Sequence, residues 1–320
     1  MMDGVEPLLE VRDLIVDFAT HAGTVRAVAG MSFELARGET LALVGESGCG
    51  KSTTARAVMQ LPKPSAGEVW LEREDLTQVT PARMRELRRR LQIVFQDPIA
   101  SLNPRMRVAD IIAAPLRVTG QGTRHEQRQQ VAAMLEAVGL DPAVAMDKRP
   151  HQFSGGQCQR ISIARALILA PDLLVCDEPV SALDVSIQAQ ILNLLEDMKE
   201  RYALTMLFIS HDLAVVKSIA DRVAVMYLGR ICEIAPAETL YSAPTHPYTQ
   251  ALLSAIPIPD PAAELGQPDL VDGELPSPMN PPSGCVFRTR CPRARARCAE
   301  EIPALRLRDG GGSVACHFAA

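Results

Sequence analysis

Residues 45–52 read Gly-Glu-Ser-Gly-Cys-Gly-Lys-Ser and match the phosphate-binding pattern G-x-x-x-x-G-K-[ST] at every position. The glycines allow a tight turn whose N–H groups point inward at an anion, the lysine reaches the phosphates, and the serine hydroxyl can hold Mg²⁺. A predicted strand at 40–44 precedes the loop and a predicted helix at 52–61 follows it, which disfavours a chance glycine-rich turn. The residues expected at a bound nucleotide are Gly45, Glu46, Ser47, Gly48, Cys49, Gly50, Lys51, Ser52 and Thr53.

The order of apolar runs along the chain predicts an α/β fold. The runs at 173–176, 205–209 and 223–227 are typical of strands covered on both faces of a largely parallel sheet, and residues with helical spacing lie between the first two. Residues from about 97 to 160 are more polar and mostly helical in pattern, as an inserted subdomain would be. We expect a phosphate-loop NTPase domain over residues 1–256 with this inserted helical subdomain.

Composition and charge narrow the classes of protein. The chain has 320 residues and a net charge of −5, which argues against a general nucleic-acid binder. No apolar run approaches the ~20 residues that cross a bilayer. The N-terminus is acidic and has no signal-peptide pattern. We therefore expect a cytoplasmic protein whose membrane role, if it has one, comes through a partner.

Two carboxylates lie at the end of a predicted strand. Asp177 and Glu178 directly follow the apolar run 173–176. A carboxylate at this place can bind Mg²⁺, and its neighbour can accept a proton from a water beyond the terminal phosphate. The alternative is an ordinary solvated turn, which the phosphate loop disfavours. We expect Asp177 to be a magnesium ligand and Glu178 to be the general base.

A third motif, Phe153-Ser-Gly-Gly-Gln157, resembles the signature sequence of ATP-binding cassette (ABC) ATPases. Its serine can cap a helix that begins at the glycines, and the bare N–H groups there form a second anion site. The resemblance implies head-to-tail pairing of two subunits, with each ATP between the phosphate loop of one and the signature of the other. The signature residues expected at the nucleotide are Ser154, Gly155, Gly156 and Gln157.

The remaining motifs of the family follow in order and cover most of residues 8–235. The resemblance implies that Gln96 contacts Mg²⁺ and the attacking water, and that Asp184 lies along the dimer interface. It also implies that His211 contacts the γ-phosphate. Phe18 resembles the aromatic residue that stacks on adenine, although its place in an alternating apolar run equally fits packing in the core.

Further stretches are similar to the ATP-binding subunits of oligopeptide/dipeptide importers. They are Phe95–Arg105, Tyr227–Arg230, Thr245–Gln250 and the tail from Asn280 to His317. In one departure, Glu72 or Arg73 stands where the family usually has glycine, so we expect a changed hairpin turn. The resemblance implies a second ABC ATPase subunit, identical or homologous, two integral membrane permease subunits and, indirectly, a solute-binding protein. It places the chain at the cytoplasmic face of the cell membrane.

Four of the eight cysteines lie in the last 36 residues, after a proline-rich linker at 257–284: Cys285, Cys291, Cys298 and Cys316. Their spacing lacks the close pairs of a zinc ribbon. Four thiolates can bind a [4Fe–4S] cube, and the resemblance implies such a cluster in some members; zinc and free thiols are the alternatives. Arg288, Arg290, Arg293, Arg295 and Arg297 are expected to offset the negative charge of such a site. We expect the segment 285–320 to lie outside the path of ATP chemistry.

Together these motifs predict an ATPase whose ATP hydrolysis powers the import of peptides. A soluble ABC ATPase of the ribosome or of DNA is one alternative, but it would need two cassettes or a long coiled-coil insertion. A structural subunit without turnover is another, which the intact Glu178 and His211 disfavour. An importer ATPase for another solute, such as nickel, is the third.

Overall fold

The computed structural model describes residues 6–21, 23–256, 274–308 and 311–319, which form two compact units. Unit 1 comprises Met1–Leu35, Glu39–Thr77 and Ser210–Ala320, and unit 2 comprises Ala36–Gly38 and Gln78–Ile209. Residues 257–273 of the predicted linker lie outside the described residues. Within the described part of the chain, no helix is both long enough and apolar enough to cross a membrane.

Unit 1 contains an antiparallel sheet in the order β2-β1-β4-β5. Leu9 of β1 pairs with Leu35 of β2 on one side and with Leu71 of β4 on the other. This sheet differs from the largely parallel arrangement that the sequence predicted, because short turns join β1 to β2 and β4 to β5, and β4 returns antiparallel to β1 after β3 and α1. Its strands are β1 (Leu9–Thr20), β2 (Gly23–Leu35), β4 (Ala66–Leu71) and β5 (Glu74–Asp75).

A second group of strands in unit 1 carries the phosphate loop. The predicted strand at 40–44 is β3, which pairs in parallel with β9, and β9 pairs antiparallel with β10. β10 then pairs with β12, and β12 with β11, in the tail of the chain. The bounds are β3 (Thr40–Val44), β9 (Arg222–Tyr227), β10 (Arg230–Pro236), β11 (Arg306–Leu307) and β12 (Ser313–Val314). The helices of unit 1 are α1 (Lys51–Val58), α9 (Leu213–Ile219), α10 (Ala237–Ser242), α11 (Pro247–Ser254) and α12 (Ala296–Glu300).

The hairpin between β4 and β5 keeps its pairing without the family's glycine. Trp70 pairs with Asp75 and Leu71 with Glu74, so Glu72 and Arg73 form the turn. Glu72 has a φ of 57°, in the left-handed region that glycine favours. Glu72 therefore adopts a backbone conformation that glycine takes more readily.

Unit 2 contains three parallel strands, in the order β8-β7-β6. Leu173 of β7 pairs with Leu91 of β6 and with Thr205 of β8, and every residue of β7 and β8 is buried. This confirms the strands predicted at 173–176 and 205–209. The bounds are β6 (Leu91–Val94), β7 (Leu173–Asp177) and β8 (Thr205–Ser210), with helices α2 (Pro81–Leu87) and α8 (Val185–Tyr202).

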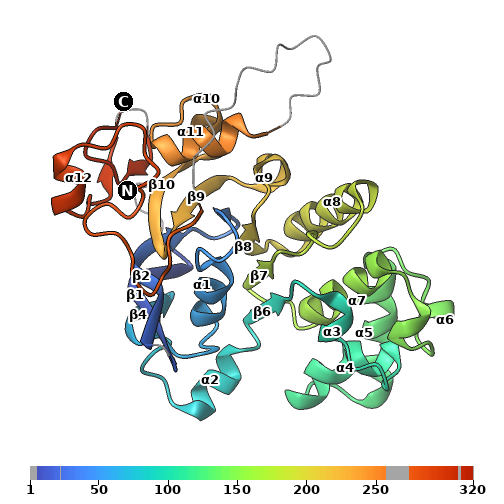
Figure 1. Ribbon diagram of the computed structural model, residues 1–320. Helices are drawn as coiled ribbons and strands as arrows, with labels where there is room; N and C mark the ends of the chain where they lie inside the picture. The colour runs from blue at the N-terminus through green and yellow to red at the C-terminus, as the bar shows by residue number, and fades with distance from the viewer. Residues whose placement is uncertain (1–5, 22, 257–273, 309–310, 320) are drawn as a thin grey trace, which may run out of the picture. The chain divides into compact units, whose positions relative to one another are not determined.

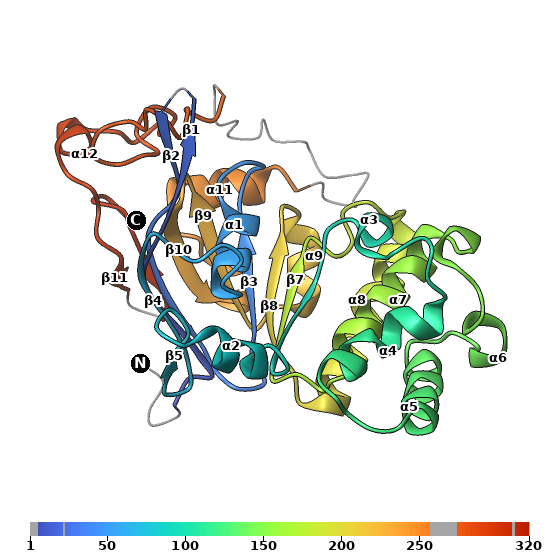
Figure 2. The ribbon, with the colours of Figure 1, turned by 90° about the horizontal axis from the view of Figure 1, so that it is seen from below.

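The helical part of unit 2 begins just after β6. There α4, α5 and α7 pack against one another, with α3 beside α7 and α6 beside α5 (Figures 1 and 2). Their apolar faces form a small core that includes Ile112, Leu116, Val131, Leu135 and Ile161. The bounds are α3 (Pro98–Ser101), α4 (Val108–Val118), α5 (Arg124–Ala137), α6 (Pro142–Ala145) and α7 (Gly155–Leu167), with a 3₁₀ turn at Pro150–Gln152.

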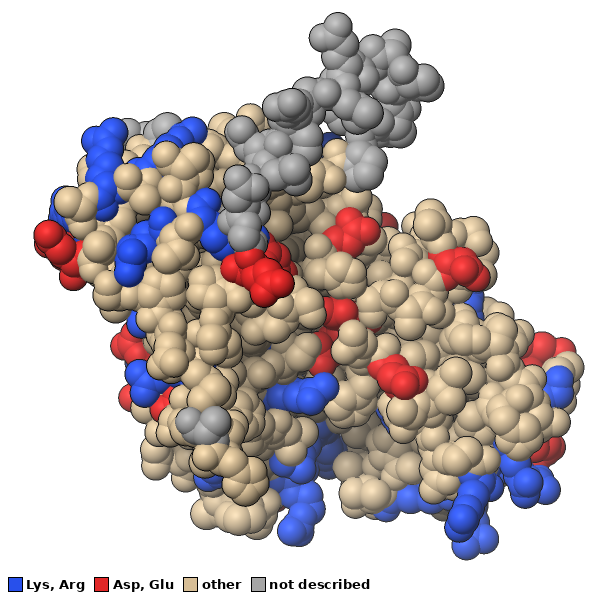
Figure 3. Space-filling view, in the orientation of Figure 1, with Lys and Arg blue, Asp and Glu red and all other residues tan. Residues whose placement is uncertain are grey.

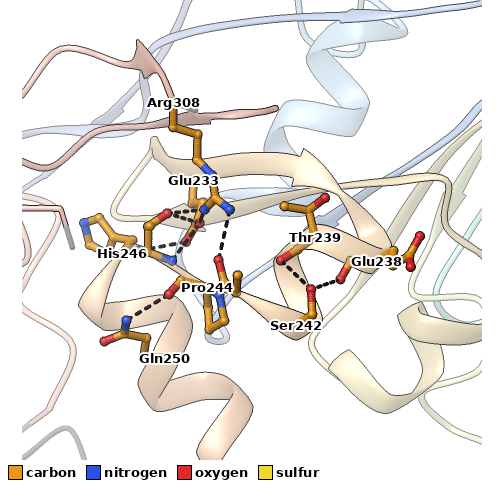
Figure 4. A network of polar contacts seen from close by, with 10 residues as sticks. Glu233, Glu238, Thr239, Ser242, Pro244, His246, Gln250 and Arg308 are labelled. Carbon is orange, nitrogen blue, oxygen red and sulfur yellow. Dashed lines mark hydrogen bonds and ion pairs between the residues drawn. The ribbon is translucent and has the colours of Figure 1, made fainter. Parts of the chain in front are cut away.

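A buried polar network connects β10 to the tail (Figure 4). The side chain of Glu233 is 0% exposed and accepts hydrogen bonds from the backbone N–H groups of Thr245 and His246, at 2.9 Å each, and from the Thr245 hydroxyl. Arg308 donates to the same carboxylate at 2.8 Å. Because a buried carboxylate is stable only when it is paired and hydrogen-bonded, the network fixes the tail strand beside β10.

His246 makes the stability of this region depend on pH. Burial lowers its pKa from 6.5 to about 4, and its neutral Nδ1 accepts a hydrogen bond from the N–H of Tyr248 at 3.1 Å. Below pH 6.5 the unfolded chain binds a proton that the folded chain does not, so stability is full above that pH and falls as the pH drops towards 4.

We predict that His246→Asn, which keeps an acceptor for the Tyr248 N–H but does not titrate, loses less stability on acidification than the unaltered protein. A depression of this size corresponds to about 3 kcal/mol of pH-dependent stability. Urea unfolding between pH 7 and pH 4 measures the difference. Parallel pH profiles for the two proteins would contradict the assignment.

Candidate functional site

The phosphate loop passes between the backbones of two neighbouring strands. Gly45, Gly48 and Gly50 have φ values of 155°, 81° and 107°. A Cβ atom at Gly45 would lie 2.2 Å from the carbonyl oxygen of Met226, and one at Gly50 would lie 2.2 Å from that of Ala27. Only glycine fits at these two positions, so the loop can keep its N–H groups pointing inward.

Lys51 is the first residue of α1 and is 4% exposed. Its ammonium donates hydrogen bonds to the carbonyl oxygens of Gly45 and Glu46, at 2.7 and 2.9 Å. The positive charge is therefore held within the loop, where phosphate oxygens can replace the carbonyl oxygens as acceptors.

The other residues of the phosphate loop differ in their exposure to solvent. Ser47 and Gly48 are exposed, and Ser52 and Thr53 are partly exposed. Cys49 is 1% exposed, and burial raises the pKa of its thiol although the ammonium of Lys51 lowers it. The Cys49 side chain therefore packs beneath the loop, and only its backbone faces the place expected for phosphate.

Two further predicted site residues belong to unit 1. Phe18 is 40% exposed on β1, so the alternative of a buried core position is wrong, and an accessible ring is what stacking on adenine requires. His211 is exposed at the end of β8. The next residue, Asp212, caps α9 by accepting from the N–H of Ala214 at 2.8 Å, which fixes the turn that carries the histidine.

Unit 2 brings Gln96 and Glu178 together from sequence positions 82 residues apart. The side-chain amide of Gln96 donates to the Glu178 carboxylate at 3.0 Å. Glu178 has a φ of 48°, and its N–H donates to the carbonyl of Ile209 at 3.1 Å, which holds the backbone in place. Asp177, the preceding residue, is 0% exposed at the end of β7. The predicted base thus has a defined orientation and a hydrogen-bonding partner.

The signature also lies in unit 2 and forms the predicted helix cap. The Ser154 hydroxyl accepts from the N–H of Gln157 at 3.3 Å, and the Gln157 side chain accepts from the N–H of Ser154 at 3.0 Å. This reciprocal pair starts α7. A Cβ atom at Gly156 would lie 2.6 Å from Cγ2 of Ile187, and Asp184 is exposed at the start of α8.

The four tail cysteines gather within unit 1. Burial raises the pKa of the thiols of Cys285, Cys291 and Cys316, and the neighbouring thiol of Cys298 raises each of them further. The four sulfurs therefore lie within electrostatic range of one another. Among the described residues, however, no group of three or more His, Cys, Asp or Glu side chains has the arrangement of a site for a metal ion.

The arginines between these cysteines were expected to offset the negative charge of the cysteine site, but most of them make other contacts. Burial raises the pKa of the thiols of Cys291 and Cys316, and the charge of Arg293 partly opposes that rise. Arg288 donates to the Ser283 carbonyl, Arg297 pairs with Glu301, and Arg295 lies over the ring of Phe318. Basic side chains gather on the surface of this segment (Figure 3). Arg295 and Arg297 thus contact residues of the segment itself, whereas Arg288 contacts the residues just before it.

Arg290 is a residue whose role the sequence did not reveal. It donates to both carboxylate oxygens of Glu46 in the phosphate loop, at 3.0 and 2.9 Å. The cysteine segment therefore contacts the phosphate loop, and its expected place outside the ATP chemistry stays a prediction. In the sequence, Arg290 is one of several arginines in the tail and lies 244 residues from Glu46, so no local pattern indicated this contact.

We predict that Gly50→Ala weakens nucleotide binding while Gly30→Ala does not. Both glycines have positive φ, so both variants carry the same kind of backbone strain, but a Cβ at Gly30 meets nothing within 4 Å. Overpacking of this kind costs about 1–3 kcal/mol, enough for a loss of affinity of about 10-fold or more. Titration with a fluorescent ATP analogue measures it, and equal affinities for the two variants would show that the close contact does not shape the loop.

Two family models match the chain. One describes the ABC transporter family and covers residues 28–181. The other describes the C-terminal region of oligopeptide/dipeptide transporters and covers residues 232–298. The second match includes three of the four tail cysteines and Arg290. The two matched regions together contain the phosphate loop, the signature, the carboxylate pair and much of the tail.

Relatives and solved structures agree with these matches. The chain is 54% identical to the oligopeptide transport ATP-binding protein OppF of Escherichia coli, over 95% of this chain and 94% of OppF. It is 53% identical to a putative peptide import ATP-binding protein of Brucella ovis, over 97% of each. A dimeric ATP-binding cassette solved in a post-hydrolysis state with ADP and Pi matches at 26% identity, with a TM-score of 0.66 over 72% of this chain and 98% of that one. The chain belongs to the ABC family of ATPases, among the ATP-binding proteins of oligopeptide/dipeptide transporters.

Proposed function

We propose that this chain is the ATP-hydrolysing subunit of a membrane importer of peptides. The observation that carries the proposal is the identity to OppF along nearly the whole chain, tail included. The site supports turnover, because the expected base, Glu178, is present and oriented by Gln96. The names of these relatives refer to peptide or oligopeptide transport. They therefore favour a peptide importer over a nickel importer and over an ATPase of the ribosome or of DNA.

The residues of the site have different proposed roles in ATP hydrolysis. Glu178 accepts the proton of the attacking water, and Gln96 holds its carboxylate in position. Lys51 exchanges its carbonyl partners for phosphate oxygens and stabilises the charge that develops during transfer. Ser52 and Asp177 would hold Mg²⁺, which offsets charge on the phosphates.

The assembly that we propose has two cassettes and two permease subunits. Each ATP lies between the phosphate loop of one cassette and the Ser154 signature of the other, and a dimeric cassette among the matched structures supports this arrangement. The second cassette is a copy or a relative of this chain. The helical subdomain contacts the permeases at the cytoplasmic face of the membrane, and a solute-binding protein delivers the peptide.

We predict that Glu178→Gln lowers phosphate release by the assembled transporter at least ~100-fold while ATP binding persists, because the amide cannot accept the proton. The substitution keeps an oxygen that can accept from Gln96, so the local geometry is retained. The test uses tagged full-length chain purified from native membranes with its partners, reconstituted into vesicles and stimulated with peptide.

Glu196→Gln provides the matched control, since it makes the same change on the exposed face of α8. It should leave peptide-stimulated phosphate release unchanged. Undiminished release in Glu178→Gln would remove this residue from the role of base. Copurification with ribosomal proteins or nucleic acid in place of integral membrane proteins would refute the importer.

We further propose that the four tail cysteines hold a [4Fe–4S] cluster, which would supply a structural crosslink or an electron-accepting centre. Burial raises the pKa of the thiols of Cys285, Cys291 and Cys316, and the backbone N–H groups of Phe287, Arg293 and Phe318 respectively oppose that rise. Such donors stabilise ligating thiolates. The four sulfurs also lie within electrostatic range of one another, as the ligands of one cluster must.

Anaerobically purified protein is then expected to be brown and to contain about four irons per chain. Cys291→Ser should bleach it, whereas Cys158→Ser, which removes a buried thiol of unit 2, should not. Iron analysis and visible absorption measure this outcome. Colourless protein with one zinc per chain would favour the zinc alternative, and metal-free protein with four titratable tail thiols would contradict both.

A further inference from the structure

The ion pair between Arg290 and Glu46 is shielded from solvent. The Arg290 side chain is 9% exposed and that of Glu46 is 29% exposed. One guanidinium nitrogen contacts both carboxylate oxygens, and it also donates to the Tyr227 hydroxyl at 3.4 Å. Burial opposes the charge of Arg290, yet its hydrogen bonds to Glu46 and Tyr227 raise its pKa above the ordinary value. The contact differs from an exposed surface pair, which contributes little.

Glu46 is the second residue of the phosphate loop and is held at three points. Its carbonyl accepts from Lys51 at 2.9 Å, its N–H donates to the Tyr248 hydroxyl at 3.0 Å, and its carboxylate is held by Arg290. These partners come from α1, α11 and the cysteine segment. The loop conformation thus depends on two segments that follow the last strand of the cassette core.

Packed aromatic rings hold Arg290 in place. Phe287, three residues earlier, is 1% exposed and accepts from the N–H of Arg290 through its carbonyl, at 3.0 Å. Its ring lies 5.2 Å from that of Tyr227 and 5.3 Å from that of Tyr248. Arg290 itself lies 5.8 Å from the centre of the Tyr227 ring. Because these rings are buried, the guanidinium has little freedom to leave the carboxylate.

The charges explain why the loop needs this arginine. A carboxylate in a loop that binds a triphosphate repels the ligand, and the repulsion is strong where water is partly excluded. A buried guanidinium cancels this charge without occupying the loop's inward N–H groups.

We propose that Arg290 is a positioning residue for ATP, which neutralises Glu46 and fixes the phosphate loop from within the cysteine segment. The proposal rests on ATP binding at this loop. It assigns the segment a role in nucleotide affinity, because Cys285 and Cys291 bracket the turn that presents Phe287 and Arg290. Loss of order in that turn would weaken ATP binding without any change in the loop's sequence.

The test compares ATP, ADP and adenosine binding to full-length Arg290→Gln. We expect ATP to bind about 10-fold more weakly, a typical size for coupling between two sites, with a smaller loss for ADP and none for adenosine. Arg290→Lys should restore part of the affinity. The control is Arg297→Gln, which makes the same change in the same segment at an exposed residue that pairs with Glu301 and not with the loop.

The double variant Arg290→Gln/Glu46→Gln separates charge from packing. If Arg290 acts by neutralising Glu46, the second substitution recovers most of the ATP affinity. The proposal would be overturned if Arg290→Gln lost as much affinity for adenosine as for ATP, or if the double variant recovered no ATP affinity. Arg290 would then be a structural residue. Unchanged ATP affinity in Arg290→Gln would overturn it as well, whereas failure of the unaltered protein to bind ATP would refute the proposed function instead.

If Arg290→Gln does not fold, Arg290→Lys takes its place in the experiment. Lysine keeps the charge but loses the planar fork, so it should show an intermediate loss of ATP affinity, and added Glu46→Gln should abolish the salt dependence of that loss. A loss of ATP affinity in Arg290→Lys that stayed the same at low and high salt, and that persisted after Glu46→Gln was added, would contradict a charge-based role.

Discussion

The close approach of the phosphate loop to neighbouring backbone is the constraint on which unit 1 depends. The carbonyl oxygens of Met226 and Ala27 stand where side chains at Gly45 and Gly50 would be. The loop therefore requires β9 and β2, which belong to two different sheets, to lie beside it. Because the packing of the two sheets places these backbones, the nucleotide site depends on the packing of the whole unit.

The structure of unit 1 also depends on contacts between the cassette and the tail of the chain. β12 pairs with β10, and Glu233 and Arg308 connect the same two regions beneath the surface. Phe287 then packs against Tyr227, at the end of β9. A segment that contains four cysteines and little regular structure is thus attached to the cassette through a buried ion pair and an aromatic cluster. These contacts explain how a tail without a large core of its own can be ordered.

Local sequence was sufficient where structure depends on neighbours along the chain. The strands at 40–44, 173–176 and 205–209 were recognised because both faces are apolar. The cap at Ser154 was recognised because its partner lies three residues away. β10 and α11 were not recognised, since their short apolar runs have no distinctive period and are stabilised by contacts with Glu233 and the tail. The antiparallel arrangement of β1, β2 and β4 was missed for a similar reason, because strand direction is set by pairing across the sheet.

By itself, the sequence determined the chemistry of the phosphate loop, the carboxylate pair and the signature, because each is encoded within a few consecutive residues whose spacing dictates their geometry. Tertiary structure alone decided which distant residues support them. Gln96 meets Glu178, and Arg290 meets Glu46, only after strands and rings far apart in the chain have packed together. An arginine has the same local pattern whether its carboxylate partner lies four or 244 residues away, so only the folded chain reveals the pair.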